Sequence, residues 1–95
     1  MATVKKSDLQ QSKYNYTWSR DQGDGEYTGI RDRERIDKDE GYEVTYFIQA
    51  FLNRFNKPAT LENIRAVEDE LQRSQYSHIV MREELIRKLK EAFNL

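Results

Sequence analysis

The sequence contains no cysteine, one histidine and one proline among its 95 residues. Without cysteine, the chain can form neither a disulfide nor a thiolate metal site, and it has no cysteine nucleophile. The lone His78 cannot supply a histidine-rich zinc site, and no serine lies in a Gly-x-Ser-x-Gly elbow. The many carboxylates stand beside basic residues, as on solvated helix faces. We therefore expect no enzyme activity, no metal site and no cofactor.

Neither sign of charge dominates, because 16 Lys and Arg residues stand against 17 Asp and Glu residues, for a net charge of −1. Nucleic-acid binders usually carry a basic surplus, since neutralising phosphates supplies much of their affinity. Long apolar runs are also missing: the longest, Tyr46 to Leu52, is far shorter than the roughly 20 residues of a membrane span. No apolar segment follows the lysines near the N-terminus, so this stretch does not have the pattern of a secretory signal. We expect no membrane span and a cytoplasmic location.

Glycine is scarce as well, and all four glycines lie at or before Gly41. The cluster from Asp21 to Glu26 has the composition of a turn, and its acidic residues do not have the spacing of an EF-hand loop. Three earlier glycines form a Gly-x-Gly-x-x-x-Gly pattern, which is one residue too long for the dinucleotide-binding fingerprint. The glycines therefore indicate turns, and they predict neither a calcium loop nor a nucleotide site.

In the N-terminal part of the chain, aromatic and small polar residues alternate from Tyr14 to Trp18. A period of two is typical of a half-buried strand, in which Tyr14, Tyr16 and Trp18 would share one face. The turn cluster and a weaker second strand, 26–30, follow. The segment 13–31 is therefore predicted to be a β-hairpin. Its aromatic face should pack on helices, because an isolated hairpin is marginally stable in water.

After Gly41, the apolar residues follow the helical spacing i, i+3, i+4, i+7, i+8 and i+11. They are Val44, Phe47, Ile48, Phe51, Leu52 and Phe55. Three phenylalanines on one face of a helix must be buried against other elements. We expect a helix over about 41–56, with Asp37 or Asp39 as its capping residue, that ends before Pro58.

Two further helices are expected after this break, over about 60–73 and 78–94. Thr60 is a good N-cap for the first of them. Its inner face carries Leu61, Ile64, Val67 or Glu68, and Leu71. Ser77 is the candidate cap of the last helix, although the sequence leaves open whether 76–80 is helical or extended. The phenylalanine stripe should pack against apolar residues of both helices, namely Ile64, Leu71, Leu85, Leu89 and Phe93.

These elements predict an α+β fold, in which an N-terminal β-hairpin packs on a three-helix C-terminal core within one domain, 1–95. Residues 1–12 show no apolar periodicity and are expected to be disordered. The helical core is expected over 41–95. The stretch Gly41–Val44 resembles stretches of small bacterial and phage proteins, but it identifies no family.

A short chain with many aromatic side chains and no catalytic signature favours a non-enzymatic protein-interaction module. Its partner would be another protein or a second copy of the same chain, and no motif identifies it. Five aromatic residues are the candidate contacts: Tyr14, Tyr16, Trp18, Tyr42 and Tyr46.

The alternative is a nucleic-acid-associated protein, against which the balanced charge counts. Such a protein would stack bases on the hairpin aromatics or bind phosphate through the last helix. The basic residues of that helix are Arg82, Arg87, Lys88 and Lys90. Three glutamates stand among them and would repel phosphate, so protein binding remains the first hypothesis.

Overall fold

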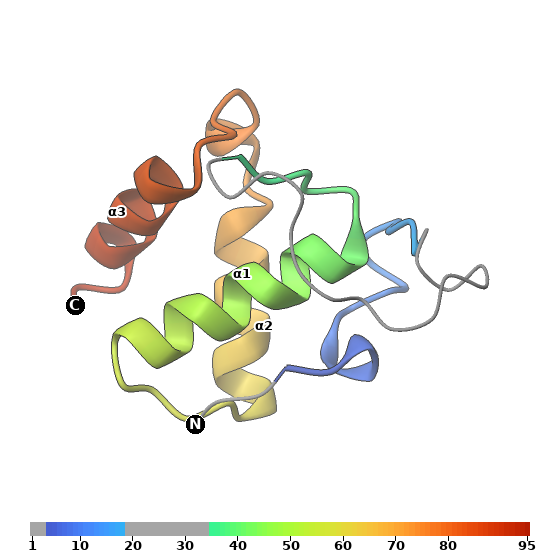
Figure 1. Cartoon of the computed structure of the whole chain (residues 1–95), viewed down its shortest axis with the longest axis horizontal. Helices are drawn as coiled ribbons and strands as arrows, with labels where there is room; N and C mark the ends of the chain where they lie inside the picture. The colour runs from blue at the N-terminus through green and yellow to red at the C-terminus, as the bar shows by residue number, and fades with distance from the viewer. Residues whose placement is uncertain (1–3, 19–34) are drawn as a thin grey trace.

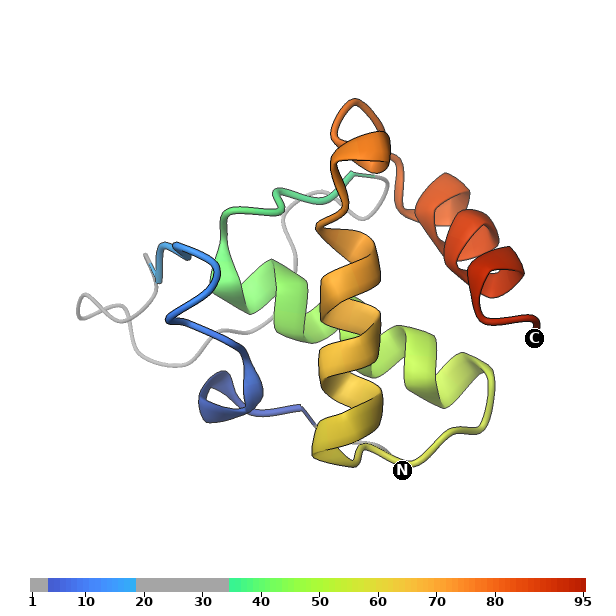
Figure 2. The ribbon, with the colours of Figure 1, turned by 180° about the vertical axis from the view of Figure 1, so that it is seen from behind.

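Three α-helices make up most of the computed structural model, which describes residues 4–18 and 35–95. They are α1 (Gly41–Arg54), α2 (Leu61–Leu71) and α3 (Arg82–Ala92), with short 3-10 turns at η1 (Lys6–Asp8) and η3 (Ser74–Tyr76). α2 crosses α1, and the N-terminal segment 4–18 lies on the opposite side of α2 from α3 (Figure 1 and Figure 2). Among the described residues, no helix has both the length and the apolar character that a membrane crossing requires.

The phenylalanine stripe of α1 is the centre of the core. Phe47 and Phe51 are almost completely buried, and their rings stack with centroids 6.4 Å apart. The Phe51 ring also contacts the partly buried rings of Phe55, at 4.9 Å, and Phe93, at 6.0 Å. The other predicted partners are buried as expected: Ile64, Leu71, Leu85 and Leu89. The helical spacing of apolar residues therefore predicted the centre of the core correctly.

Both α1 and α3 end with an asparagine in the left-handed backbone conformation. Asn56 has a φ of 60° and Asn94 a φ of 61°. After Asn56, the Lys57 N–H donates to the Leu52 carbonyl at 2.8 Å, and the corresponding hydrogen bond after Asn94 is 3.0 Å long. This Schellman arrangement satisfies carbonyl groups that would otherwise be left unpaired at a helix end.

α1 begins at Gly41, as the sequence predicts, but the predicted N-cap residue is right only for α2. The Thr60 hydroxyl accepts a hydrogen bond from the Asn63 N–H at 3.1 Å, as an N-cap should. At α1 the N-cap position is Glu40, and neither Asp37 nor Asp39 occupies it. The Asp37 carboxylate instead accepts a hydrogen bond from the Asp39 N–H at 2.9 Å, so it orders the turn that precedes the helix.

The predicted α+β fold is wrong, because the described residues contain three helices and no β-strand. Thr17 makes only an isolated parallel bridge with Glu40. The Thr17 N–H donates to the Asp39 carbonyl at 2.7 Å, and the Thr17 carbonyl accepts from the Gly41 N–H at 2.8 Å. Within 4–18 and 35–95, the aromatic alternation therefore takes part in no β-ladder beyond this bridge. The rest of the predicted hairpin, 19–31, lies outside the described residues.

α3 begins at Arg82, later than the sequence predicts. Before it, Ile79 is buried in the core, and the Val80 carbonyl accepts a hydrogen bond from the Ile36 N–H at 2.9 Å. The open question about 76–80 is thereby answered: after η3 the chain forms a turn and a non-helical stretch. Of its two β-branched residues, Val80 pairs with the segment before α1, while the Ile79 N–H donates to the Tyr76 carbonyl at 2.9 Å within the turn.

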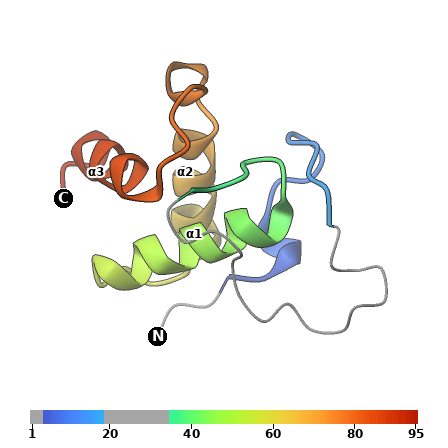
Figure 3. The ribbon, with the colours of Figure 1, turned by 45° about the horizontal axis from the view of Figure 1, so that its top comes forward.

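The N-terminal segment contacts the helices along its length. Val4 and Leu9 belong to the buried core, and the Val4 N–H donates to the Gln49 side chain of α1 at 3.0 Å. Figure 3 shows the segment beside the first turns of α1, on the side of α2 away from α3. Two side chains of the stretch 1–12, for which the sequence predicts disorder, are thus part of the core.

We predict that Phe51→Ala lowers the free energy of unfolding by about 3–5 kcal/mol, because it removes a buried ring from the centre of the core. Urea unfolding followed by circular dichroism measures the loss. Leu61→Ala, at a side chain of α2 that is 50% exposed, is the control. Its change should stay below about 1 kcal/mol. An equally small loss for Phe51→Ala would show that this ring does not stabilise the core.

Candidate functional site

Four of the five predicted contact residues lie together on one surface. The ring centroids of Tyr14 and Tyr16 are 6.1 Å apart, as are those of Tyr16 and Trp18. Trp18 then meets Tyr42 of α1 edge-on, at a centroid distance of 5.0 Å. All four side chains are partly exposed, and we call them the aromatic row. The fifth residue, Tyr46, lies one turn further along α1 and is 38% exposed.

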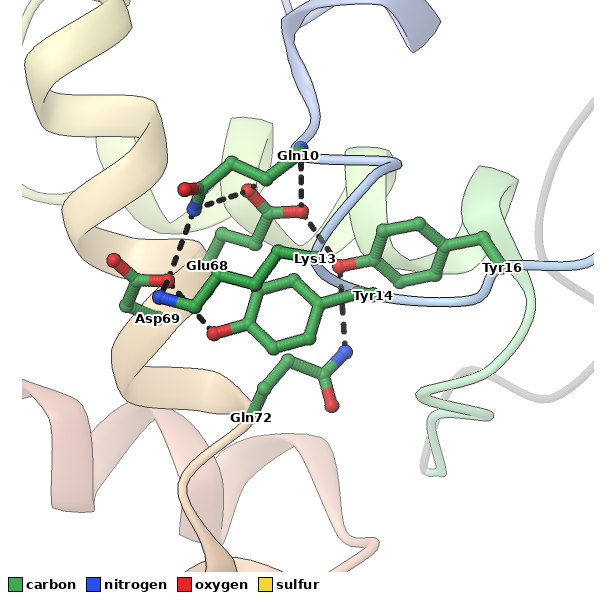
Figure 4. Close-up of polar contacts among 7 residues, drawn as sticks. All are labelled: Gln10, Lys13, Tyr14, Tyr16, Glu68, Asp69 and Gln72. Atoms are coloured by element: carbon green, nitrogen blue, oxygen red, sulfur yellow. Dashed lines mark hydrogen bonds and ion pairs between the residues drawn. The ribbon is translucent and has the colours of Figure 1, made fainter.

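The hydroxyl groups of two tyrosines in the row point toward acidic residues of α2, as Figure 4 shows. The Tyr16 hydroxyl donates to the Glu68 carboxylate at 2.6 Å, and the Tyr14 hydroxyl donates to the Asp69 carboxylate at 2.7 Å. Hydrogen bonds to an ionised acceptor are short and roughly twice as strong as those between neutral groups. They hold both rings in fixed positions on α2.

Glu68 is completely buried, so its carboxylate depends on hydrogen bonds from the protein. Besides the Tyr16 hydroxyl, its donors belong to Gln10. The Gln10 backbone N–H lies 3.1 Å from each carboxylate oxygen, and the Gln10 side-chain amide lies 3.0 Å from one of them. The same amide also donates to Asp69, at 2.9 Å. Glu68 therefore ties the stretch 10–16 to α2.

Two further contacts close this polar network at its edges. The Lys13 ammonium group donates to Asp69 at 3.0 Å. Gln72, at the C-terminal end of α2, donates from its side chain to the Tyr16 hydroxyl at 3.4 Å and to the Lys38 carbonyl at 3.0 Å. The network thus joins the N-terminal segment, α2 and the loop that leads into α1.

Burial and hydrogen bonding together shift the pKa values of these groups. Burial raises the pKa of Tyr14 and Tyr16 well above the ordinary value, and hydrogen bonding to the carboxylates raises it further, because each phenol must keep its proton to donate. Burial alone would raise the pKa of Asp69. Hydrogen bonds from Tyr14, Lys13 and Gln10 outweigh that effect, so the pKa of Asp69 lies below its ordinary value. At neutral pH the network therefore pairs neutral phenols with an ionised Asp69.

Trp18 packs directly on the backbone at the start of α1. A Cβ atom on Gly41 would lie 2.4 Å from the indole ring, so only glycine allows this close approach. The Lys6 ammonium nitrogen lies 4.8 Å from the Trp18 ring centroid, and the Lys13 nitrogen lies 5.4 Å from that of Tyr14. Both are cation–π distances. Within the described residues, the indole N–H of Trp18 donates no hydrogen bond.

The four basic residues of the alternative hypothesis do not form one cluster. Arg82 is 7% exposed, and its guanidinium group lies over an aromatic ring of the core. Arg87 and Lys90 line one groove of about 300 Å³ together with Arg54 and Glu83, whose side chains form an ion pair at 3.1 Å. Lys88 is partly buried. The structure therefore brings two of the four together, beside the Arg54–Glu83 ion pair.

The described residues offer binding groups and no metal site. In 4–18 and 35–95, no three His, Asp or Glu side chains are arranged to hold a metal ion, and His78 is exposed. Chemically, the aromatic row offers flat apolar surfaces, an indole N–H donor and two nearby ammonium groups. Such a combination is suited to recognising another molecule by contact.

The sequence predicts no acidic partners for the aromatic row. It placed either Val67 or Glu68 on the inner face of α2, and both are buried, at 3% and 0% exposure. A carboxylate at a helix position that the apolar spacing predicts to be buried indicates that polar partners must reach it. That signal was available, but nothing in the sequence identified Gln10 or Lys6 as neighbours of the site.

The chain matches no protein-family model, and neither a curated protein nor a solved structure is significantly similar to it. Its function must therefore be inferred from the geometry of the aromatic row and of the groups around it.

We predict that Glu68→Ala lowers the free energy of unfolding by roughly 2–5 kcal/mol, because the Tyr16 hydroxyl and the Gln10 N–H lose their acceptor. Glu68→Gln keeps one acceptor oxygen and should lose less than half as much. Urea unfolding measures both losses. Arg65→Ala, on the exposed face of α2, is the control and should stay within about 0.5 kcal/mol of wild type. Equal losses for the alanine and glutamine variants would contradict the role given to the acceptor.

Alkaline pH should destabilise the protein through the two anchored tyrosines. Their folded-state pKa values lie above the ordinary value of 10.0, so their contribution to stability is fully present below that pH. It is lost as the pH rises toward the raised values, because the unfolded chain ionises its phenols first. We predict that the free energy of unfolding falls above about pH 10, and that Tyr16→Phe makes this fall shallower. Urea unfolding at a series of pH values measures both slopes, and identical slopes would contradict the prediction.

Proposed function

We propose that this protein is a small non-enzymatic interaction module that binds another protein through the aromatic row. The observation that carries the proposal is the row itself, in which four partly exposed rings follow one another in contact. Tyrosine and tryptophan are enriched in protein interfaces, because they bury a large apolar area while keeping a polar end.

The way in which the rings are held supports binding. Ordering a mobile side chain at an interface costs roughly 0.5–1.5 kcal/mol. Hydrogen bonds to α2 already fix the rings of Tyr14 and Tyr16, and packing on Gly41 fixes that of Trp18. A partner that covers the row would therefore lose little binding energy to ordering it.

We also propose that the protein acts in the cytoplasm, with which its high content of charged residues, 35%, is compatible. Fractionation of cells that produce the tagged protein tests this location.

Nucleic-acid association is the second candidate function. In its favour, Lys6 and Lys13 stand over rings of the row, as basic residues do around base-stacking aromatics. Against it, Asp69 pairs with Lys13 at 3.0 Å. Neighbouring ring planes are also turned by 51°, 71° and 90°, so flat bases cannot stack continuously along them. Protein binding therefore ranks first.

Sedimentation velocity at several concentrations, followed by partner capture from cell extract and titration of the purified partner, tests the proposal. We predict that Trp18→Ala weakens association with that partner, or with a second copy, by at least about tenfold, since central interface aromatics often contribute about 2 kcal/mol or more. Tyr46→Ala is the matched control, because it removes a partly exposed tyrosine of α1 outside the row and should leave the affinity unchanged.

An unchanged affinity in Trp18→Ala, or an equal loss in Tyr46→Ala, would contradict the aromatic row as the contact surface. A strictly monomeric protein that captures no partner would contradict the proposal as a whole. Titration with single- and double-stranded oligonucleotides at ~50 mM salt tests the second candidate. Binding that needs Trp18 and weakens steeply with added salt would favour nucleic-acid association.

A further inference from the structure

The groove beside the Arg54–Glu83 ion pair lies at the other end of α1 from the aromatic row. It has a volume of about 300 Å³, and its lining consists of three basic, one acidic and two apolar side chains: Arg54, Phe55, Glu83, Ile86, Arg87 and Lys90. Its four α3 residues have the helical spacing i, i+3, i+4 and i+7, so one face of α3 forms this wall. Tyr42 of the aromatic row lies about 18 Å from Arg54 along the axis of α1.

We propose that this groove binds a phosphate monoester with an apolar or aromatic substituent. The inference goes beyond the proposed function, because it concerns a second site with its own ligand.

The charges of the groove favour a doubly charged anion. Its three basic groups stand against one carboxylate, which leaves two positive charges in excess. Glu83 precedes Arg87 by one turn, but its carboxylate pairs with Arg54 instead. Within the part of the chain that the structure describes, the charged groups of Arg87 and Lys90 have no partner. A phosphate monoester carries about −1.5 to −2 charges at pH 7, so a single such group balances the excess.

The Arg54–Glu83 ion pair shows that the groove already holds an anionic group. One nitrogen of Arg54, Nη1, donates to the two carboxylate oxygens of Glu83 at 3.2 and 3.1 Å. The two side chains are 51% and 78% exposed, and so exposed an ion pair contributes little to stability. A dianion can therefore displace the Glu83 carboxylate. Its oxygens also match the paired N–H donors of a guanidinium group better than a point charge does.

The apolar side chains of the groove indicate what the phosphate is attached to. Ile86 is 9% exposed, and the partly exposed Phe55 ring packs against Phe51 at a centroid distance of 4.9 Å. The Phe55 ring is therefore held in place beside the basic groups. An aromatic substituent on the phosphate would bury apolar area against it, which inorganic phosphate cannot do.

A nucleic acid fits this groove less well. Each of its phosphates carries a single charge, and its neighbours follow along the strand. A groove of this volume lies at the lower limit for small-molecule sites, so it admits one compact group. The Glu83 carboxylate at its edge would repel the adjoining phosphates. These features favour an isolated monoester over a phosphodiester strand.

A ¹H–¹⁵N NMR titration at ~50 mM salt, where screening is weak, tests the inference with phenyl phosphate as the probe. We expect saturable shifts of the amides of 54–55 and 83–90, with a dissociation constant below about 1 mM. Phenyl sulfate has the same shape with one charge less, and inorganic phosphate lacks the ring. Both should bind at least about threefold more weakly. A phosphotyrosine peptide distinguishes the two sources of the ester: tighter binding than phenyl phosphate indicates a protein-borne group, and weaker binding a free small molecule.

Variants test the assigned residues in the same titration, and circular dichroism checks that each variant is folded. Arg87→Ala should weaken phenyl phosphate binding at least about fivefold. Arg65→Ala removes the same charge from the exposed face of α2 and should leave it unchanged. Glu83→Gln removes the internal competitor and should strengthen binding at least about twofold. Glu91→Gln, on an exposed part of α3 outside the groove, is the matched control for that change.

No saturable shift in the groove up to about 10 mM phenyl phosphate, or equal binding of phenyl phosphate and phenyl sulfate, overturns the inference. So do equal effects of Arg87→Ala and Arg65→Ala, or weaker binding in Glu83→Gln. An oligonucleotide that shifts the same amides at lower concentration than phenyl phosphate overturns the monoester as the ligand. None of these results bears on the aromatic row, because Trp18→Ala tests that surface with a different partner.

Discussion

The Glu68 carboxylate is the group on which the rest of the described structure depends. It is completely buried, and a carboxylate in such a place is strongly destabilising unless the protein supplies hydrogen bonds to it. Its donors come from Gln10 and Tyr16, which lie 58 and 52 residues earlier in the chain. α2 can therefore bury this face only when the N-terminal segment is in place. The position of that segment depends in turn on its hydrogen bonds to α2.

This dependence explains how the aromatic segment is held among the described residues, which contain no β-strand. The Gln10 N–H finds its acceptor in Glu68, and the Thr17 N–H and carbonyl are paired with the chain that leads into α1. Hydrogen bonds to charged groups contribute about 1.5–3 kcal/mol each, whereas a lone two-stranded hairpin is marginal in water. Among the described residues, hydrogen bonds to α2 and to the chain before α1 therefore hold this segment in place.

The sequence predicts the helical core well and the extended parts poorly, for a physical reason. The spacing of Phe47 and Phe51 along the chain maps directly onto one face of a helix, and the structure buries that face. A period of two says only that a segment is extended. Whether its backbone pairs with another strand or with side chains depends on residues far away, such as Glu68. The aromatic residues of the site could be chosen from the sequence, but the meeting of Trp18 with Tyr42 could not, because it depends on the packing of the indole ring on Gly41.

The aromatic residues of the proposed binding surface all carry a polar group, although the core also contains one tyrosine, Tyr76. All four phenylalanines of the chain lie in the core or at its rim, while the aromatic row consists of tyrosine and tryptophan only. A phenylalanine at position 16 would keep the ring but lose the hydrogen bond to Glu68. A tyrosine there does two things at once: its hydroxyl satisfies a buried charge, and its partly exposed ring stays where that bond holds it. The interaction that stabilises the fold is therefore also the one that fixes this ring of the proposed binding surface, so the two effects cannot be changed independently at this residue.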